Sequence, residues 1–242
     1  MKNIRCELKN ENYIVAFVDI LGASKKIKNN PDKSLNVVHD VYEYVLHYLK
    51  AFCDDVDLIE AKPVFRVFSD NIIVAVPVEP HGIEAAFLSA AIHTALVQNH
   101  FLVSKCLTRG GMSIGGFFSD EIMVWGQALV SAYEIENSIS IYPRVVVHPD
   151  LIEKIKNTDS SASKYLKQDD DGLYYIDYLF EFLPYGKEGE TLLTRHYNDC
   201  KVMREEEKGN IKSIQKIDWF ENYLKTKLNS QSAIVGGGDA NA

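Results

Sequence analysis

The stretch Tyr13-Ile-Val-Ala-Phe-Val-Asp-Ile20 decides the fold that this sequence predicts. It is almost continuously apolar and rich in β-branched and aromatic residues, which is typical of a buried strand. Its single charged residue, Asp19, stands next to the predicted end of the strand. The Leu-Gly-Ala-Ser segment at 21–24 then predicts a chain reversal. The sequence therefore places a carboxylate at the end of a buried strand.

Outward from this strand, helical and strand patterns alternate. Asn30-Pro31-Asp32 has the chemistry of a helix start, with an N-cap, a proline in the first helical position and an acidic first turn. Ser69 and Asp70 have tight-turn chemistry and predict a hairpin. The expected elements are a strand at 13–20, an amphipathic helix at 31–52, strands at 63–68 and 71–77, a helix at 83–103 and a strand at 106–117. This β-α-β-β-α-β order predicts an α+β protein with a ferredoxin-like core.

The rest of the chain adds shorter elements and a C-terminal appendage. We expect an extended segment at 121–125, a helix at 127–137, a strand at 142–148, a helix at 149–156, an exposed loop at 157–171, a strand at 172–182 and helices at about 192–207 and 213–228. These patterns divide the chain into a main domain at 1–182, a C-terminal helical extension at 183–229 and a flexible tail at 230–242.

Composition excludes several classes of protein. The 242 residues are 46% hydrophobic and 25% charged, which excludes collagen-like, disordered and coiled-coil proteins. The net charge of −8 argues against a non-specific nucleic-acid-binding protein but is compatible with a small anionic ligand. The absence of an 18-residue apolar run predicts no membrane span, and the lack of an apolar N-terminal segment predicts no signal peptide and a cytoplasmic protein.

Cysteines and histidines give no sign of a metal site. The cysteines are far apart and form no C-x-x-C motif, so we expect free thiols: Cys6, Cys53, Cys106 and Cys200. The seven histidines follow no ligand pattern.

Two carboxylates carry the functional prediction. Asp19 ends a buried strand, and Asp70 lies at the tip of the hairpin that the ferredoxin-like topology places beside it. Each alone has an ordinary explanation, since Asp70 fits turn chemistry and Asp19 could cap the reversal. As a converging pair they would repel each other unless a cation lay between them. Oxygen ligands favour two Mg²⁺ or Mn²⁺ ions, which in such sites clamp phosphate oxygens.

The sequence also resembles class III nucleotidyl cyclases over roughly residues 13–148. Four segments carry the resemblance in the same order and spacing: Val-Ala-Phe-Val-Asp-Ile-Leu-Gly-Ala-Ser at 15–24, Val-Phe-Arg-Val-Phe-Ser-Asp at 64–70, Thr-Arg-Gly-Gly-Met-Ser-Ile-Gly at 108–115 and Val-Trp-Gly-Gln-Ala-Leu at 124–129. Within this class, the segments at 19–22, 109–115 and 126–136 are most similar to the bacterial pyrimidine cyclases of Pycsar antiphage systems.

The resemblance implies roles for particular residues. The carboxylates of Asp19 and Asp70 and the backbone carbonyl of Ile20 would hold the two metal ions. The 3′-hydroxyl of the nucleotide would attack the α-phosphate and release pyrophosphate. Backbone amides would cradle the β- and γ-phosphates at Leu21, Gly22, Ala23 and Ser24. For Arg109, a contact with the phosphates and a structural salt bridge remain equally open.

Departures from the class concern the base and the transition state. Arg66 stands where adenylyl cyclases carry a base-reading Lys, and Met123 stands where they carry an acidic residue. Val130 and Glu134 replace the Asn and Arg of the transition state. Because arginine only donates hydrogen bonds, Arg66 suits O4 of uracil rather than the amino group of cytosine. UTP is the predicted substrate and cyclic UMP the predicted product, with CTP or a purine nucleotide as alternatives.

The same resemblance implies a homodimer and a separately encoded effector that binds the cyclic nucleotide as an antiphage signal. Two other functions stay open: a catalytically silent nucleotide- or protein-binding module, and a palm-type polymerase or nucleotidyltransferase, which the acidic charge disfavours. Outside the motifs, Arg144 is predicted to be structural, and Lys164 and Lys167 to be solvated loop residues.

Overall fold

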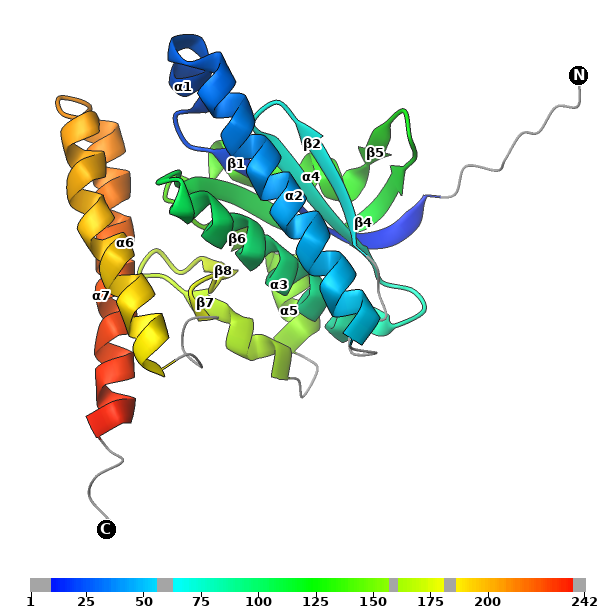
Figure 1. The fold of residues 1–242 in the computed structure, drawn as a ribbon. Helices are drawn as coiled ribbons and strands as arrows, with labels where there is room; N and C mark the ends of the chain where they lie inside the picture. Colours follow the sequence, from blue (N-terminus) through cyan, green and yellow to red (C-terminus); the bar gives the residue numbers. More distant parts are fainter. Residues whose placement is uncertain (1–9, 56–62, 157–160, 181–185, 237–242) are drawn as a thin grey trace, which may run out of the picture.

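The computed structural model describes residues 10–55, 63–156, 161–180 and 186–236 (Figure 1). The strands are β1 (Glu11–Ile20), β2 (Val64–Phe68), β3 (Asn71–Pro77), β4 (Thr108–Ser119), β5 (Val124–Gly126), β6 (Val145–Val147), β7 (Leu166–Gln168) and β8 (Tyr174–Ile176). The helices are α1 (Ala23–Asn29), α2 (Pro31–Asp55), α3 (Gly82–Val103), α4 (Gln127–Ser138), α5 (Pro149–Lys156), α6 (Gly186–Glu206) and α7 (Ile211–Gly236), with a 3₁₀ turn η1 at Ser161–Tyr165.

The strands form one sheet in the order β2-β3-β1-β4-β6-β8-β7, and β5 pairs with β4. β1 lies in the interior of the sheet and is antiparallel to both β3 and β4, whereas β4 and β6 are parallel. The predicted α+β fold with a ferredoxin-like βαββαβ core is confirmed. The register places Asp19 between Asn71 of β3 and Arg109 of β4.

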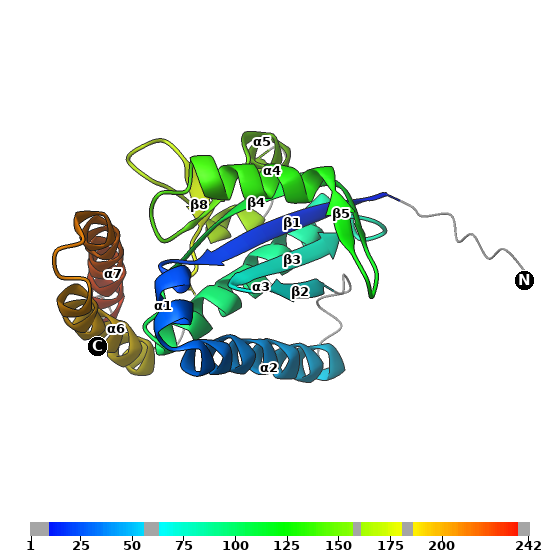
Figure 2. The same ribbon diagram turned by 90° about the horizontal axis from the view of Figure 1, so that it is seen from above.

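Residues of β1 alternate between two cores. Ile14, Ala16 and Val18 belong to the larger core, which α2 and α3 cover, while Val15 belongs to a smaller core that includes Ala128 of α4. Figure 2 shows α2 and α3 on one side of the sheet and α4 on the other. Because Asp19 has the same parity as Val15, it lies on the α4 side of the sheet.

Three sequence expectations need correction. The reversal expected at 21–24 is a two-residue turn with Gly22 in the left-handed region (φ 73°), and the chain then enters helix α1. Within the described residues, the strands expected at 142–148 and 172–182 shorten to β6 and β8, and the loop expected at 157–171 contains η1 and β7. Residues 157–160 and 181–182 of these segments lie outside the described part. The bounds of such short strands depend on pairing with strands far away in the sequence, which local sequence patterns do not predict.

The C-terminal hairpin is longer than predicted. α7 continues to Gly236, so the first part of the segment expected to be a flexible tail is helical, and 237–242 lie outside the described residues. The Ser230 hydroxyl donates a hydrogen bond to the Thr226 carbonyl of the preceding turn (2.8 Å), so this polar side chain is accommodated within the helix. Arg204 joins the two helices by an ion pair to Asp218 (2.6 Å) and another to Glu221.

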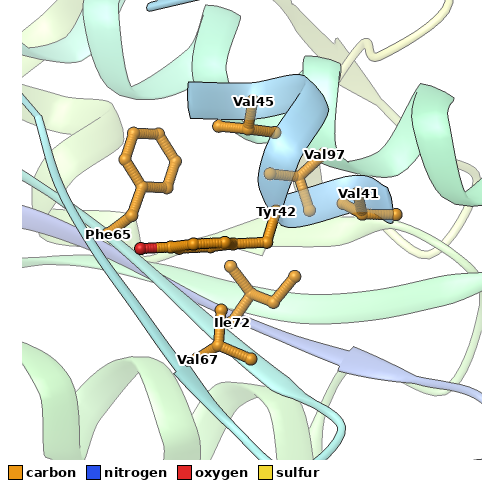
Figure 3. Close-up of a pocket in the computed structure, with 7 residues that line it drawn as sticks. All are labelled: Val41, Tyr42, Val45, Phe65, Val67, Ile72 and Val97. Carbon is orange, nitrogen blue, oxygen red and sulfur yellow. The ribbon is translucent and has the colours of Figure 1, made fainter. Parts of the chain in front are cut away.

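Among the described helices, α3 alone is long and apolar enough to cross a membrane by length and composition. However, 78% of the most apolar 18-residue segment of α3 is buried inside the fold, as is usual for a core helix. A recess on the α2 side of the sheet is lined by Val41, Tyr42, Val45, Phe65, Val67, Ile72 and Val97 (Figure 3). It is apolar apart from one tyrosine hydroxyl, and it lies on the sheet face opposite Asp19.

Candidate active site

The fold brings Asp19 and Asp70 together at the end of β1. Asn71, the register partner of Asp19, directly follows Asp70, and the N–H of Ile20 donates to the Asp70 backbone carbonyl (3.3 Å). Partial burial raises the pKa of the Asp19 carboxyl, and the negative charge of Asp70 raises it further. The two carboxylates therefore interact unfavourably, as the sequence analysis expected of a pair at this point in the topology.

The donor chemistry of this pair fits a hard divalent cation. Two carboxylates supply oxygen ligands of the type that Mg²⁺ and Mn²⁺ prefer, and Mg²⁺ usually takes its remaining ligands from water and substrate phosphates. In the described part of the chain, no group of three or more His, Cys, Asp and Glu residues is arranged to hold a metal. Two metal ions at Asp19, Ile20 and Asp70 thus stay a prediction.

Arg109 provides the positive charge beside Asp19. Its guanidinium lies 3.6 Å from an Asp19 carboxylate oxygen and 2.5 Å from a Glu136 carboxylate oxygen, and it donates to the Ser140 carbonyl at 3.1 Å. Arg109 therefore forms a salt-bridge network in this structure. A phosphate contact would require it to exchange one of these partners.

Glu136 belongs to the site and was not predicted from the sequence. α4 approaches β4 so closely that a Cβ on Gly111 would lie 2.1 Å from the Ala132 carbonyl oxygen. Glu136 follows Ala132 by one helical turn and therefore reaches Arg109. Burial raises the pKa of Glu136, whereas Arg109 opposes this shift. The Gly-Gly pair at 110–111 was the available sequence signal, because it marks a close backbone approach.

Lys216 of α7 is the second residue that the sequence did not reveal. Its ammonium group interacts electrostatically with Arg109, Asp19 and Glu136. Burial lowers the pKa of Lys216, and the positive charge of Arg109 lowers it further. No motif links residue 216 to the site, since its position depends on how α7 docks.

The predicted phosphate segment directly follows β1. The N–H of Leu21 donates to the Leu107 carbonyl (2.9 Å), which fixes the start of the turn, and Gly22 supplies the left-handed residue. Ala23 and Ser24 begin α1. The segment thus lies beside Asp19, and its phosphate-binding role stays a prediction.

The predicted base-binding residues meet elsewhere. The Arg66 guanidinium donates to the backbone carbonyls of Phe65 and Asp120 (2.8 Å each), and the Asp120 carboxylate accepts from the N–H of Met123 (2.8 Å). Arg66 and Met123 are therefore linked through the turn between β4 and β5. The base of that arm lies at the end of β1 opposite to Asp19, because Phe117 pairs with Glu11. Arg66 itself pairs with Ile73, the register partner of Phe17.

The structure also shows the exposure of three other residues that the sequence analysis singled out. Val130 and Glu134 are exposed on α4. Arg144 is fully buried between carboxylates of Asp169 and Asp171, which agrees with its predicted structural role.

The two lysines predicted to be solvated loop residues differ in their surroundings. Lys167 donates to Thr226 of α7 (3.2 Å), and its Nζ lies 5.0 Å from the ring centroid of Tyr223. Lys164 lies 5.1 Å from the ring centroid of Tyr165. Lys164 is exposed, as predicted, although it lies in η1, whereas the prediction that Lys167 is a solvated loop residue is corrected, because it lies in β7 and α7 partly covers it.

Comparisons with known proteins give solved structures only. No protein-family model matches the chain, and no curated protein matches it. Similar solved structures include the adenylyl cyclase CyaB from P. aeruginosa, with TM-score 0.49, 14% identity and coverage of 70% of this chain and 95% of that one. A bacterial light-regulated adenylyl cyclase has TM-score 0.44 and 11% identity, over 91% of this chain and 59% of that one.

A class III adenylyl cyclase-like ATP-binding protein from Pseudomonas aeruginosa has TM-score 0.40 and 11% identity, over 59% of this chain and 34% of that one. The chain thus spans about a third of that protein and about three fifths of the light-regulated cyclase. The similar structures thus include two adenylyl cyclases and a class III adenylyl cyclase-like protein.

Proposed function

We propose that this protein is a metal-dependent nucleotide cyclase. The observation that carries the proposal is the Asp19–Asp70 pair at the end of β1 within a βαββαβ core, with Arg109 beside it. The 3′-hydroxyl of a ribonucleoside triphosphate attacks its own α-phosphorus, and pyrophosphate leaves. Divalent ions held by the two carboxylates would supply charge neutralisation for this step. Arg109 would hold negative charge that develops on the phosphates by exchanging one of its present partners.

UTP is the proposed substrate. Arg66 offers donors only, which suits O4 of uracil, and Met123 offers no acceptor for an amino group of adenine or cytosine. Met123 lies in the turn between β4 and β5, and the Arg66 guanidinium of β2 reaches the same turn through the Asp120 carbonyl. Two guanidinium nitrogens of Arg66 are engaged by backbone carbonyls, which fixes the orientation of its plane. Cyclic UMP and pyrophosphate are the products of this reaction.

The proposed site needs two copies of the chain. Figure 2 shows α1 and β5 at opposite ends of β1, so the predicted phosphate segment and the β4–β5 arm of one chain lie apart along the strand. An antiparallel homodimer brings the end of one β1 to the β4–β5 turn of the other. The biological role proposed on the sequence resemblance is a cytoplasmic antiphage signal read by a separately encoded effector.

The test of the function is product formation from each of the four nucleoside triphosphates with Mn²⁺ or Mg²⁺. We expect cyclic UMP from UTP and no product in the presence of a chelator. Asp19→Asn and Asp70→Asn should each lower turnover by at least about 100-fold, equivalent to about 2.7 kcal/mol of transition-state stabilisation. Asp32→Asn, an exposed carboxylate in the first turn of α2, is the matched control and should turn over normally.

A silent nucleotide-binding module is the second candidate, because α4 presents exposed Val130 and Glu134 where cyclases of the class carry transition-state residues. Tight binding of UTP with metal and no product from any of the four nucleotides would establish this reading instead. Normal turnover by a folded Asp19→Asn or Asp70→Asn protein would overturn the assignment of the carboxylates in either case.

A further inference from the structure

The C-terminal hairpin is attached to the end of the sheet that holds Asp19. Lys25 of α1 forms an ion pair with Glu207, in the turn between α6 and α7, at 3.4 Å. Lys105, just before β4, forms another with Asp199 of α6 at 3.4 Å. Figure 2 shows the hairpin beside α1. Two contacts from different core segments therefore hold the hairpin next to the candidate active site.

The docking of α7 decides which of its side chains faces the site. The indole N–H of Trp219 donates to the Asp169 carboxylate (2.7 Å), and the Tyr223 hydroxyl bonds to Asp177. Residues three and four apart share a helix face. Lys216 precedes Trp219 by three residues and therefore belongs to the docked face, whereas Lys225 is exposed and pairs with Glu221 of its own helix at 3.0 Å.

Lys216 is a half-buried cation placed next to other cations. The charges that act on its ammonium group are the cations Arg109 and Lys212 and the carboxylates Asp19 and Glu136. Among the residues that the structure describes, no carboxylate is within ion-pair distance of Lys216, while Arg109 is bonded to Glu136. Holding two cations together in a partly desolvated place is unfavourable unless an anion joins them. The arrangement has the charge pattern of an anion site at the edge of the carboxylate pair.

We propose that Lys216 binds the triphosphate of the nucleotide, so that the C-terminal hairpin contributes a phosphate-binding residue from outside the βαββαβ core. The inference rests on the proposed function, since it names a further residue of the same site. When divalent ions occupy the Asp19 and Asp70 carboxylates, the charge of Lys216 is left for the phosphates. The hairpin then has a direct part in substrate binding as well as in packing.

The test measures binding rather than turnover. Isothermal titration calorimetry with magnesium tripolyphosphate and with magnesium UTP compares the wild type, Lys216→Met, Lys216→Arg and Lys225→Met. We expect Lys216→Met to raise both dissociation constants about tenfold or more, the effect of losing one charge-assisted hydrogen bond. Lys216→Arg should restore most of the affinity. Lys225→Met, which removes the same charge from the exposed face of α7, should bind as the wild type does.

The outcomes separate this inference from the proposed function. Unchanged affinity in a Lys216→Met protein with wild-type melting temperature overturns the role of Lys216, even where the wild type makes cyclic UMP. Weakened binding by Lys216→Met with recovery in Lys216→Arg supports the role, even where no nucleotide is cyclised. A wild type that binds neither tripolyphosphate nor UTP contradicts both proposals.

Discussion

At the scale of single residues, Gly111 sets how near α4 comes to the sheet. An added Cβ there would lie 2.1 Å from the Ala132 carbonyl oxygen and 2.7 Å from the Ile135 Cβ. Both neighbours belong to a packed helix, so the overlap cannot be relieved by turning a flexible side chain. The separation between α4 and β4 in turn places Glu136 against Arg109. One glycine therefore links the packing of the core to the electrostatics of the candidate site.

We predict that Gly111→Ala destabilises the fold by about 1–3 kcal/mol, the usual cost of overpacking. Cyclase activity should fall further than stability alone explains, because α4 must move and Glu136 loses Arg109. Thermal unfolding and steady-state turnover below the melting temperature measure the two effects. Ser131→Ala on the same helix is the control, and we expect it to change stability by less than about 0.5 kcal/mol. Wild-type stability of Gly111→Ala would contradict the packing argument.

The residues of the site differ in how far the sequence could predict them. Asp19 was found because it is a charge inside an apolar strand, and Asp70 because hairpin topology places a turn beside that strand's end. Their convergence depends only on strand order, which local patterns predict well. The positions of Glu136 and Lys216 depend on how closely α4 and α7 pack against the sheet. Side-chain contacts between segments far apart in the sequence decide this packing, so local patterns do not predict it.

At the scale of elements, α7 is fixed by an aromatic and charged cluster. The Trp219 ring stacks on Tyr142 with centroids 5.9 Å apart, and the Arg144 guanidinium carbon lies 5.7 Å from the Trp219 centroid. Buried Arg144 is also paired with Asp169, which accepts the indole N–H. The cluster ties the end of the core domain to the helical hairpin, so the boundary expected near residue 182 separates two parts that share contacts.

We predict that Trp219→Ala lowers stability by about 3–5 kcal/mol, because it removes a large packed side chain and leaves the Asp169 carboxylate with one partner fewer. For a chain of this length, each kcal/mol corresponds to a shift of about 2–4 °C in melting temperature. Calorimetry on the full chain measures this shift. Asn222→Ala, an exposed position on the same helix, serves as control and should melt with the wild type. Equal melting temperatures for Trp219→Ala and wild type would show that the cluster does not hold α7.

At the scale of the whole molecule, large apolar side chains are exposed beside both halves of the proposed site. Phe68 is 76% exposed, Ile122 93% and Trp125 59%. Ile122 and Trp125 belong to the β4–β5 arm, and Phe68 pairs with Asn71, the register partner of Asp19. Exposed apolar groups gathered at functional residues are typical of an interaction surface. They lie where the proposed antiparallel homodimer would bury them.

A mixing experiment tests whether each site is shared between two chains. Asp19→Asn alters the carboxylate half of the site, and Arg66→Ala alters the base-binding half, so each homodimer should be impaired on UTP. In an equal mixture that exchanges chains freely, about half of the dimers contain one chain of each variant, and one of the two sites in such a dimer has both halves intact. About a quarter of all sites are therefore intact. We therefore expect activity to recover to about a quarter of wild type after the chains exchange.

The matched control mixes Asp19→Asn with Asp70→Asn, which alter the same half. In that mixture every site takes its carboxylates from an altered chain, so activity should stay at the level of the separate variants. Recovery confined to the first mixture requires that the carboxylates of one chain act with Arg66 of another. If neither mixture recovers although exchange of chains is verified by labelled subunits, each chain holds a complete site, in which Asp19 and Arg66 of the same molecule act together.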